Sequence, residues 1–218
     1  NATGLPLTTG VIGTLPIANG GTGAVTAQAA SQNLATALTV EDLAALKALT
    51  SRPESVVVKT GRAADVWQWE LGSVTTADDA LVVECTAGTA GRYKRVYDSG
   101  TVHVDWWATG DGVTNDTTAI EAAASSGAGL VLFGAKTYAV KQVVFDTPNV
   151  TLQGIKGQTL IVSVDQDTST SSSTNTMFYG QADGLTFDGF SFIGKPAITY
   201  GELVYPAVAI YISRNPLD

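Results

Sequence analysis

Three carboxylates have the spacing that acid–base chemistry needs. Asp165 and Asp167 are two residues apart, so an extended chain would place both side chains on the same side. Asp188 ends a short alternating run and would point outward, toward a groove. Two carboxylates separated by roughly 5–9.5 Å are the catalytic pair of glycoside hydrolysis. The competing interpretation, which the Ser/Thr-rich and turn-like surroundings favour, is a solvated loop at 165–167 and a turn acid at Asp188.

Aromatic side chains form a second group of candidates, because a flat ring can stack on a sugar ring. Tyr200 and Tyr205 lie in a segment with Gly201 and Pro206, where we expect a surface loop, and both are candidates for contact with carbohydrate. Four tryptophans invite the same interpretation, although packing in a core is the commoner role of such rings. They are Trp67, Trp69, Trp106 and Trp107.

Other chemistries are excluded by composition. With one cysteine, Cys85, and one histidine, His103, the chain cannot form a His/Cys zinc site or an internal disulfide, and we expect no metal and no cofactor. His103 lies in a strand-like run and is predicted to be a packed or edge residue. The 12 Lys and Arg against 20 Asp and Glu give a net charge of −8, which argues against nucleic acid as a partner. No apolar run reaches the ~20 residues of a membrane span.

The N-terminal part, residues 1–53, is predicted to be an extended arm followed by short helices. Residues 1–24 are rich in Gly and Thr and have no apolar face of their own. Helical spacing of Ala and Leu predicts helices at about 26–36 and 40–49, the second capped by Thr39 and ended by Arg52 and Pro53. Because neither part can build a core alone, association of several copies is the expected role of this segment, and a disordered tether is the alternative.

Two further regions follow. Residues 54–104 contain alternating strand-like runs separated by Gly, Asp and Ser turns, which predict a small antiparallel β domain. Residues 105–218 begin with a helix at 117–124, capped by Asn115 or Asp116 and apolar on one face, and continue as short strands.

A weak internal repeat gives residues 105–218 their predicted architecture. The segment NVTLQG at 149–154 matches GLTFDG at 184–189, with Leu152 and Phe187 in equivalent positions. Short strands that recur with turns are typical of a solenoid, in which each rung buries its inward residues against the next. The first rung would leave an apolar end open, and the helix at 117–124 would cap it.

Two segments resemble motifs of known families. LPIANGGTGA at 15–24 resembles a short motif of bacteriophage tail fibres and tailspikes. GDGVTNDTTAI at 110–120, followed by LVLFGAKTY at 130–138, resembles the opening of the pectate-lyase-like right-handed β-helix. The β-helix family usually has Asp-Asp where this chain has Asn115-Asp116. The chain begins with Asn and ends after a strand-like run, so we expect it to be part of a longer polypeptide.

The resemblance implies a mainly β protein: the first rungs of a right-handed parallel β-helix, capped by a helix, in a homotrimeric tailspike. It implies a virion protein whose N-terminus joins the phage tail, the baseplate or another tailspike. Its β-helix would bind, and in the intact protein depolymerise, a bacterial surface polysaccharide by hydrolysis or as a lyase, whereas the present chain alone is expected to be inactive. The alternatives are a binding spike without cleavage and a free-standing β-helix enzyme. No membrane insertion is expected.

Overall fold

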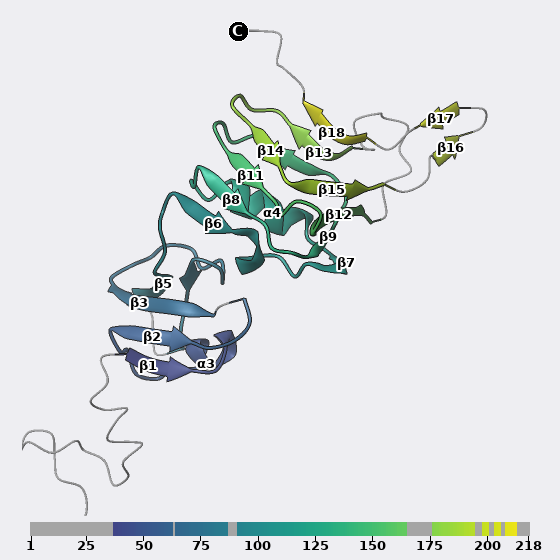
Figure 1. Cartoon of the computed structure of the whole chain (residues 1–218). Helices are drawn as coiled ribbons and strands as arrows, with labels where there is room; N and C mark the ends of the chain where they lie inside the picture. The colour runs from purple at the N-terminus through teal and green to yellow at the C-terminus, as the bar shows by residue number, and fades with distance from the viewer. Residues whose placement is uncertain are drawn as a thin grey trace, which may run out of the picture. The chain divides into compact units, whose positions relative to one another are not determined.

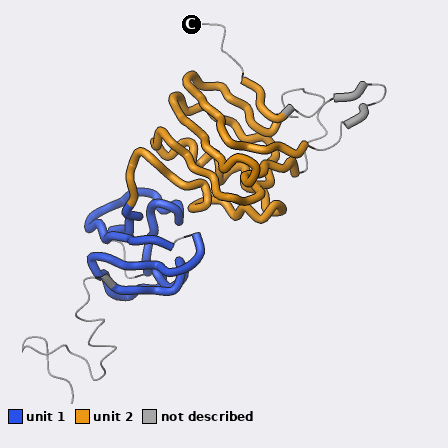
Figure 2. Tube along the Cα trace, viewed as in Figure 1, with its two compact units in different colours: residues 1–96 blue, residues 97–218 orange. Residues whose placement is uncertain are grey.

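The computed structural model describes residues 37–62, 64–86, 91–164, 176–194, 198–200, 203–205 and 208–212. It divides into two compact units, Asn1–Val96 and Tyr97–Asp218 (Figure 2). The Gly/Thr-rich arm and the helix predicted at 26–36 lie outside the described residues. Within the described ranges, no helix is long and apolar enough to cross a membrane.

The first unit is built on one mixed sheet whose strands run in the order β1-β2-β3-β5-β4. β1 pairs in parallel with β2, and the other neighbours are antiparallel. Trp67 and Tyr93 are fully buried on its inner face, as the alternation along their strands requires. The elements are β1 (Ala37–Val40), α3 (Leu43–Lys47), β2 (Ser55–Val58), β3 (Asp65–Leu71), β4 (Val82–Val83) and β5 (Gly91–Arg95).

The helix predicted at 40–49 is shorter than expected and follows a strand. Thr39 does not cap it, because Thr39 lies in β1 and pairs with Val57. The cap is Asp42, whose side chain accepts a hydrogen bond of 2.9 Å from the amide of Ala45. α3 ends at Lys47, before Arg52 and Pro53. Both β1 and α3 therefore belong to the same compact unit as the antiparallel strands.

The second unit is a parallel β-helix made of three parallel sheets (Figure 1). Each turn of the chain visits the three sheets in the same order, and α4 takes the place of a strand in the first turn. The first sheet contains β6 (Thr101–His103), β8 (Leu130–Leu132), β11 (Thr151–Gln153) and β14 (Thr186–Asp188). The second contains β7 (Asp111–Asn115), β9 (Thr137–Val140), β12 (Thr159–Ser163) and β15 (Phe190–Ile193). The third contains β10 (Val143–Phe145), β13 (Thr176–Gly180) and β18 (Val208–Ile212).

The prediction for residues 101–103 was wrong about which part of the protein they belong to. They were expected in the small antiparallel domain, but β6 pairs in parallel with β8, with Val102 opposite Val131. It is therefore the first strand of the β-helix. Both valines are fully buried in its core.

The helix α4 (Thr117–Ala124) closes the first turn of the β-helix, as predicted. Its buried face is Ile120, Ala123 and Ala124. Two of its side chains also accept hydrogen bonds from the backbone beside and within β10. The amide of Lys141 donates to Thr117 Oγ1, and the amide of Val144 donates to Glu121 Oε1, each at 2.9 Å. β10 is the first strand of the third sheet, so no earlier strand can accept hydrogen bonds from its exposed edge. The helix α4 supplies acceptors for the backbone amides there instead.

Of the two predicted caps of α4, Asn115 is the one that reaches the helix. Its side chain accepts from the amide of Thr117 at 3.2 Å. Asp116 is buried and its carboxylate turns back, accepting from the amides of Thr109 at 2.7 Å and Gly110 at 3.1 Å. Burial raises the pKa of Asp116, and these amides oppose that shift.

The predicted internal repeat is confirmed. β11 and β14 are neighbours, with Leu152 opposite Phe187. The turn residues before them, Asn149 and Gly184, both have positive φ, 59° and 71°. The two segments therefore share a left-handed turn as well as a strand register.

The corner between the first and second sheets depends on Gly189. It has φ 78°, and a Cβ there would meet the backbone of Gly154. Gly157 has a similar φ of 75°, but a Cβ at that residue would meet nothing within 4 Å. Substitutions at the two glycines therefore distinguish the cost of backbone strain from the cost of steric crowding.

We expect Gly157→Ala to lower the free energy of unfolding by about 1–2 kcal/mol. Gly189→Ala should cost about 1–3 kcal/mol more, because a neighbouring rung must move. Chemical denaturation measures both, and equal losses would contradict this packing.

Candidate functional site

The outer face of the first sheet is the candidate site. Its middle row, Val102, Val131, Leu152 and Phe187, packs in the core, so the residues on either side of that row point outward. These outward residues, named here the outer strip, form two rows across the four strands. They are Thr101, Leu130, Thr151 and Thr186, and His103, Leu132, Gln153 and Asp188.

The outer strip is polar at its exposed positions. His103, Gln153, Thr186 and Asp188 are exposed, and Leu130 and Leu132 are half-buried between them. The strip offers hydroxyl, amide, imidazole and carboxylate groups, which exchange hydrogen bonds with sugar hydroxyls. It contains no Lys or Arg.

Asp188 has no acidic neighbour across the strip. Its register partner in β11 is Gln153, and the strip contains no other carboxylate. Its own carbonyl accepts a hydrogen bond of 2.8 Å from the amide of Gly154, which fixes the backbone at this corner. The outer strip therefore has the groups for binding but not the carboxylate pair of a glycosidase.

An aromatic cluster lies beside the strip, at its first strand. The ring of Trp106 is 5.5 Å from the ring of His103, 5.3 Å from Tyr97 and 6.1 Å from Trp107, measured between centroids. Trp106 and Trp107 are half-buried and pack against the core, so they combine a structural role with partial exposure. Trp67, by contrast, is fully buried in the first unit, as core packing predicts.

The turn that carries Trp106 is fixed by Asp105. This residue lies in the short 3-10 helix η2 (Val104–Trp106). The hydroxyl of Tyr138 donates to Asp105 Oδ1 at 2.6 Å and accepts from the amide of Gly134 at 2.9 Å, while Lys136 Nζ lies 3.2 Å from the same carboxylate oxygen. Burial, and then the contact with Asp105, raises the pKa of Tyr138, so its hydroxyl stays protonated and remains a donor.

Of the other predicted site residues, the structure describes the backbone of Tyr200 and Tyr205. Asp165 and Asp167 lie outside the described residues. Tyr200 and Tyr205 do not lie in a loop as expected. They belong to a hairpin of β16 (Ile198–Tyr200) and β17 (Leu203–Tyr205), in which Tyr200 pairs with Leu203 and Tyr205 with Ile198. This hairpin lies between β15 and β18 in the chain.

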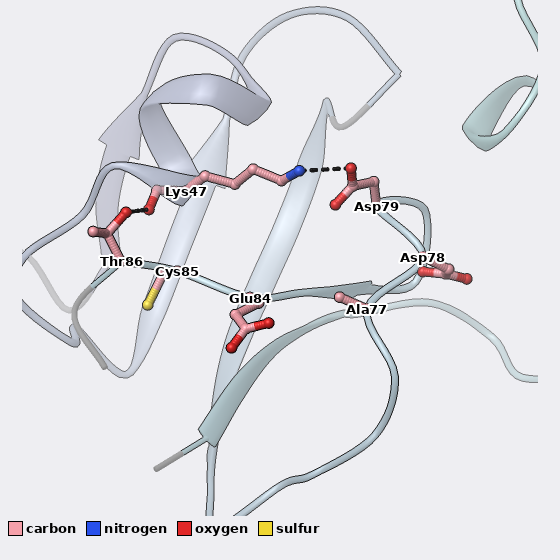
Figure 3. Close-up of a pocket in the computed structure, with 7 residues that line it drawn as sticks. All are labelled: Lys47, Ala77, Asp78, Asp79, Glu84, Cys85 and Thr86. Carbon is pink, nitrogen blue, oxygen red and sulfur yellow. Dashed lines mark hydrogen bonds and ion pairs between the residues drawn. The ribbon is translucent and has the colours of Figure 1, made fainter. Parts of the chain in front are cut away.

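The first unit contains an open pocket of about 730 Å³ (Figure 3). Its acids are already engaged. Lys47 Nζ lies 2.6 Å from Asp79 Oδ2, Glu84 pairs with Arg92 at 3.3 Å, and Asp78 Oδ1 accepts from three backbone amides at 2.8–3.0 Å. Cys85 is buried, as predicted. These contacts hold the loop around Asp78 and Asp79, and they indicate a structural role for the carboxylates.

In the parts of the chain that the structure describes, no group of three or more His, Cys, Asp or Glu side chains is placed to hold a metal ion.

Sequence reasoning found Asp188 but missed the strip around it. The internal repeat already aligned Gln153 with Asp188, which was the available signal. His103 was predicted as a packed or edge residue, and it is exposed on the edge strand β6. Its place in line with Gln153 and Asp188 became visible only once β6 was seen to pair with β8.

Comparison with known proteins supports the fold. The sequence matches no protein family and no curated protein. Among solved structures, tailspike protein gp49 of Acinetobacter baumannii bacteriophage Fri1, a capsular polysaccharide depolymerase, aligns with a TM-score of 0.62 and 12% identity over 81% of this chain. Full-length tailspike protein 2 of an Escherichia coli O157:H7 bacteriophage aligns at 0.58 with 14% identity over 80%. The enzymatically active domain of tailspike protein 2 of bacteriophage CBA120 aligns at 0.58 with 15% identity over 80%.

The chain spans only part of those proteins: 36% of gp49, 23% of the full-length tailspike and 26% of the active domain. At identities of 12–15%, the likeness concerns the fold. This chain therefore has the parallel β-helix fold found in phage tailspike proteins.

Proposed function

We propose that this chain is part of a phage tailspike that recognises a bacterial surface polysaccharide. The observation that carries the proposal is the outer strip, an exposed polar sheet face on a tailspike-like β-helix, with aromatic rings beside its first strand. The resemblance of residues 15–24 to a tail-fibre motif supports the same conclusion. One structural neighbour, gp49, is a capsular polysaccharide depolymerase.

In the intact protein, we propose depolymerisation of the same polysaccharide, whereas this chain binds without cleaving. The strip supplies one carboxylate, and hydrolysis by the usual mechanism needs two. The non-enzymatic alternative, a spike that only attaches, is favoured by the same single carboxylate. Reducing ends or unsaturated sugars released by the intact protein would exclude this alternative.

The remaining assignments are also proposals. The part of the predicted 1–53 arm that precedes β1 would form trimers and join the chain to the phage tail, baseplate or another tailspike. The small domain before the β-helix contains β1 and α3 together with the strands β2 to β5, and the β-helix begins with β6 rather than at residue 105. The protein would act as a homotrimer on the virion, outside the host cell. The Gly/Thr-rich composition of the arm supports association, because it has no apolar face to fold on alone.

The test of this function is retention of purified polysaccharides. A panel of bacterial capsular polysaccharides and O-antigens is immobilised and exposed to this chain and, separately, to the intact protein. We expect a narrow set of polysaccharides to retain this chain, and none to release reducing ends in its presence. If no polysaccharide retains either protein, the proposed function is wrong.

A further inference from the structure

We propose that the outer strip binds an electrically neutral hexose chain lengthwise, with the exposed ring of His103, supported by Trp106, stacking on one sugar and Gln153 and Asp188 hydrogen-bonding to sugars further along. This inference rests on the proposed function and adds to it the class of polysaccharide, the direction of the chain and the residues that hold it.

The direction follows from the strand register. His103, Leu132, Gln153 and Asp188 lie in one row that crosses the four strands. Neighbouring strands are about 4.8 Å apart, so His103 and Asp188 are separated by three such steps, roughly 14 Å. That row is long enough for a few hexose units laid across the strands. Gln153 would contact the central sugars, and Asp188 the far end.

The stacking position is set by the aromatic cluster. His103 is exposed on the edge strand β6, and its ring is tilted by 48° to that of Trp106. Trp106 is held in turn by an edge-to-face contact with Tyr97 and by the fixed conformation of η2. A preorganised ring pair loses little conformational freedom when a sugar ring covers it, which favours binding.

A second aromatic pair on the β-helix is a weaker candidate. Tyr179 and Tyr211 are register partners on the third sheet, with ring centroids 5.6 Å apart and planes at 23°. Because the two rings stack on each other, each one covers a face of the other. Tyr211 is nevertheless 48% exposed, so it serves as a matched control.

The neutral character of the ligand follows from charge. Asp188 is the one carboxylate of the strip, which contains no Lys or Arg, and beside the aromatic cluster Lys136 is paired with Asp105 at 3.2 Å. The whole chain carries a formal charge of −8. A polysaccharide rich in uronic or sialic acid would bring like charges together, which disfavours association. Hydroxyl and amide groups of neutral hexoses and N-acetylhexosamines meet no such penalty, and they can donate to the carboxylate.

The first test sorts the polysaccharide panel by charge. We expect the polysaccharides that retain the chain to be neutral, and titration calorimetry with one of them to give an affinity that changes less than about twofold between roughly 0.05 and 0.5 M NaCl. Retention confined to polysaccharides bearing uronic or sialic acid would overturn the inference and leave the proposed function standing.

The second test uses variants of the strip. His103→Ala and Gln153→Ala should each weaken the affinity by about three- to tenfold, because each removes one ring contact or hydrogen bond. Tyr211→Ala, an exposed aromatic on another sheet, should leave the affinity unchanged. Circular dichroism and thermal unfolding establish that all three fold. If both strip variants bind as well as the parent chain, the polysaccharide is held elsewhere and the strip assignment is wrong.

The third test addresses Asp188 itself. Asp188→Asn removes the charge and keeps the shape, so we expect about a two- to fivefold loss of affinity for the neutral chain, because a charge-assisted hydrogen bond becomes a neutral one, and a measurable gain for anionic polysaccharides of otherwise similar composition. No gain for the anionic polysaccharides would contradict the role given to this carboxylate.

Discussion

Replacing Phe178 with alanine is expected to lower the free energy of unfolding of the second unit by about 3–5 kcal/mol. Phe178 is fully buried on β13. Its ring lies 5.1 Å from Phe145, 5.7 Å from Phe187, 5.6 Å from Phe190 and 5.3 Å from Phe192. These rings come from all three sheets, so the cavity would open where successive turns meet.

Denaturant unfolding followed by circular dichroism measures this loss. Phe178→Leu fills much of the volume and should cost clearly less than the alanine variant. Tyr211→Ala removes an aromatic ring on the neighbouring strand that is half exposed, and it should cost the least. Equal costs for Phe178→Ala and Tyr211→Ala would mean that the aromatic centre does not hold the turns together.

Replacing Arg95 with alanine is expected to have a comparable effect on the first unit, about 3–5 kcal/mol. The Arg95 side chain is fully buried. Its Nε donates to the carbonyl of Ala80 at 2.6 Å, its Nη2 to the carbonyl of Arg62 at 2.7 Å and its Nη1 to Asp65 at 3.2 Å. The guanidinium also lies 4.7 Å from the centre of the Trp67 ring. Without the guanidinium, the buried carbonyl of Ala80 and the part-buried acceptors of Arg62 and Asp65 would lose their donor.

Two variants test the reason for this effect. Arg95→Lys keeps the charge but cannot reach three acceptors with a planar fork, so we expect it to recover only a small part of the loss. Lys94→Ala removes the preceding residue, which forms a surface ion pair with Glu70 at 2.5 Å and is partly exposed, and it should leave unfolding nearly unchanged. Full stability of Arg95→Lys would show that charge, rather than the three hydrogen bonds, is what the site needs.

Local patterns in the sequence predicted the β-helix well. The repeat at 149–154 and 184–189 predicted a shared register, and Leu152 does pair with Phe187. The apolar face of α4 predicted a cap, and Ile120 is buried. Both signals are local, because each lies within a few residues whose spacing fixes which side chains point inward.

The errors came from pairings that join distant parts of the chain. Threonine is a residue type that often caps helices, but Thr39 pairs with Val57 in a strand, and this pairing decides its conformation. The strand at 101–103 looks like the strands before it, and only its parallel partner β8 places it in the β-helix. Spacing within a segment contains no information about which segment it pairs with, so these assignments required the structure.

The candidate site was predictable only in part, because its residues come from distant segments of the chain. Asp188 was identified because it ends a strand with clear alternation. The exposed row that gives Asp188 its context also contains His103, which lies 85 residues earlier in the sequence. The register partner of Asp188 in this row is Gln153, and binding is the role that we propose for Asp188.

The most direct test of the account is adsorption to living bacteria. The labelled chain is mixed with a strain that displays a polysaccharide retained in the panel and with an isogenic strain that lacks it. We predict binding to the first strain alone, with a clear loss for a chain carrying both His103→Ala and Gln153→Ala. Equal binding of the chain to both strains would contradict polysaccharide recognition by this protein.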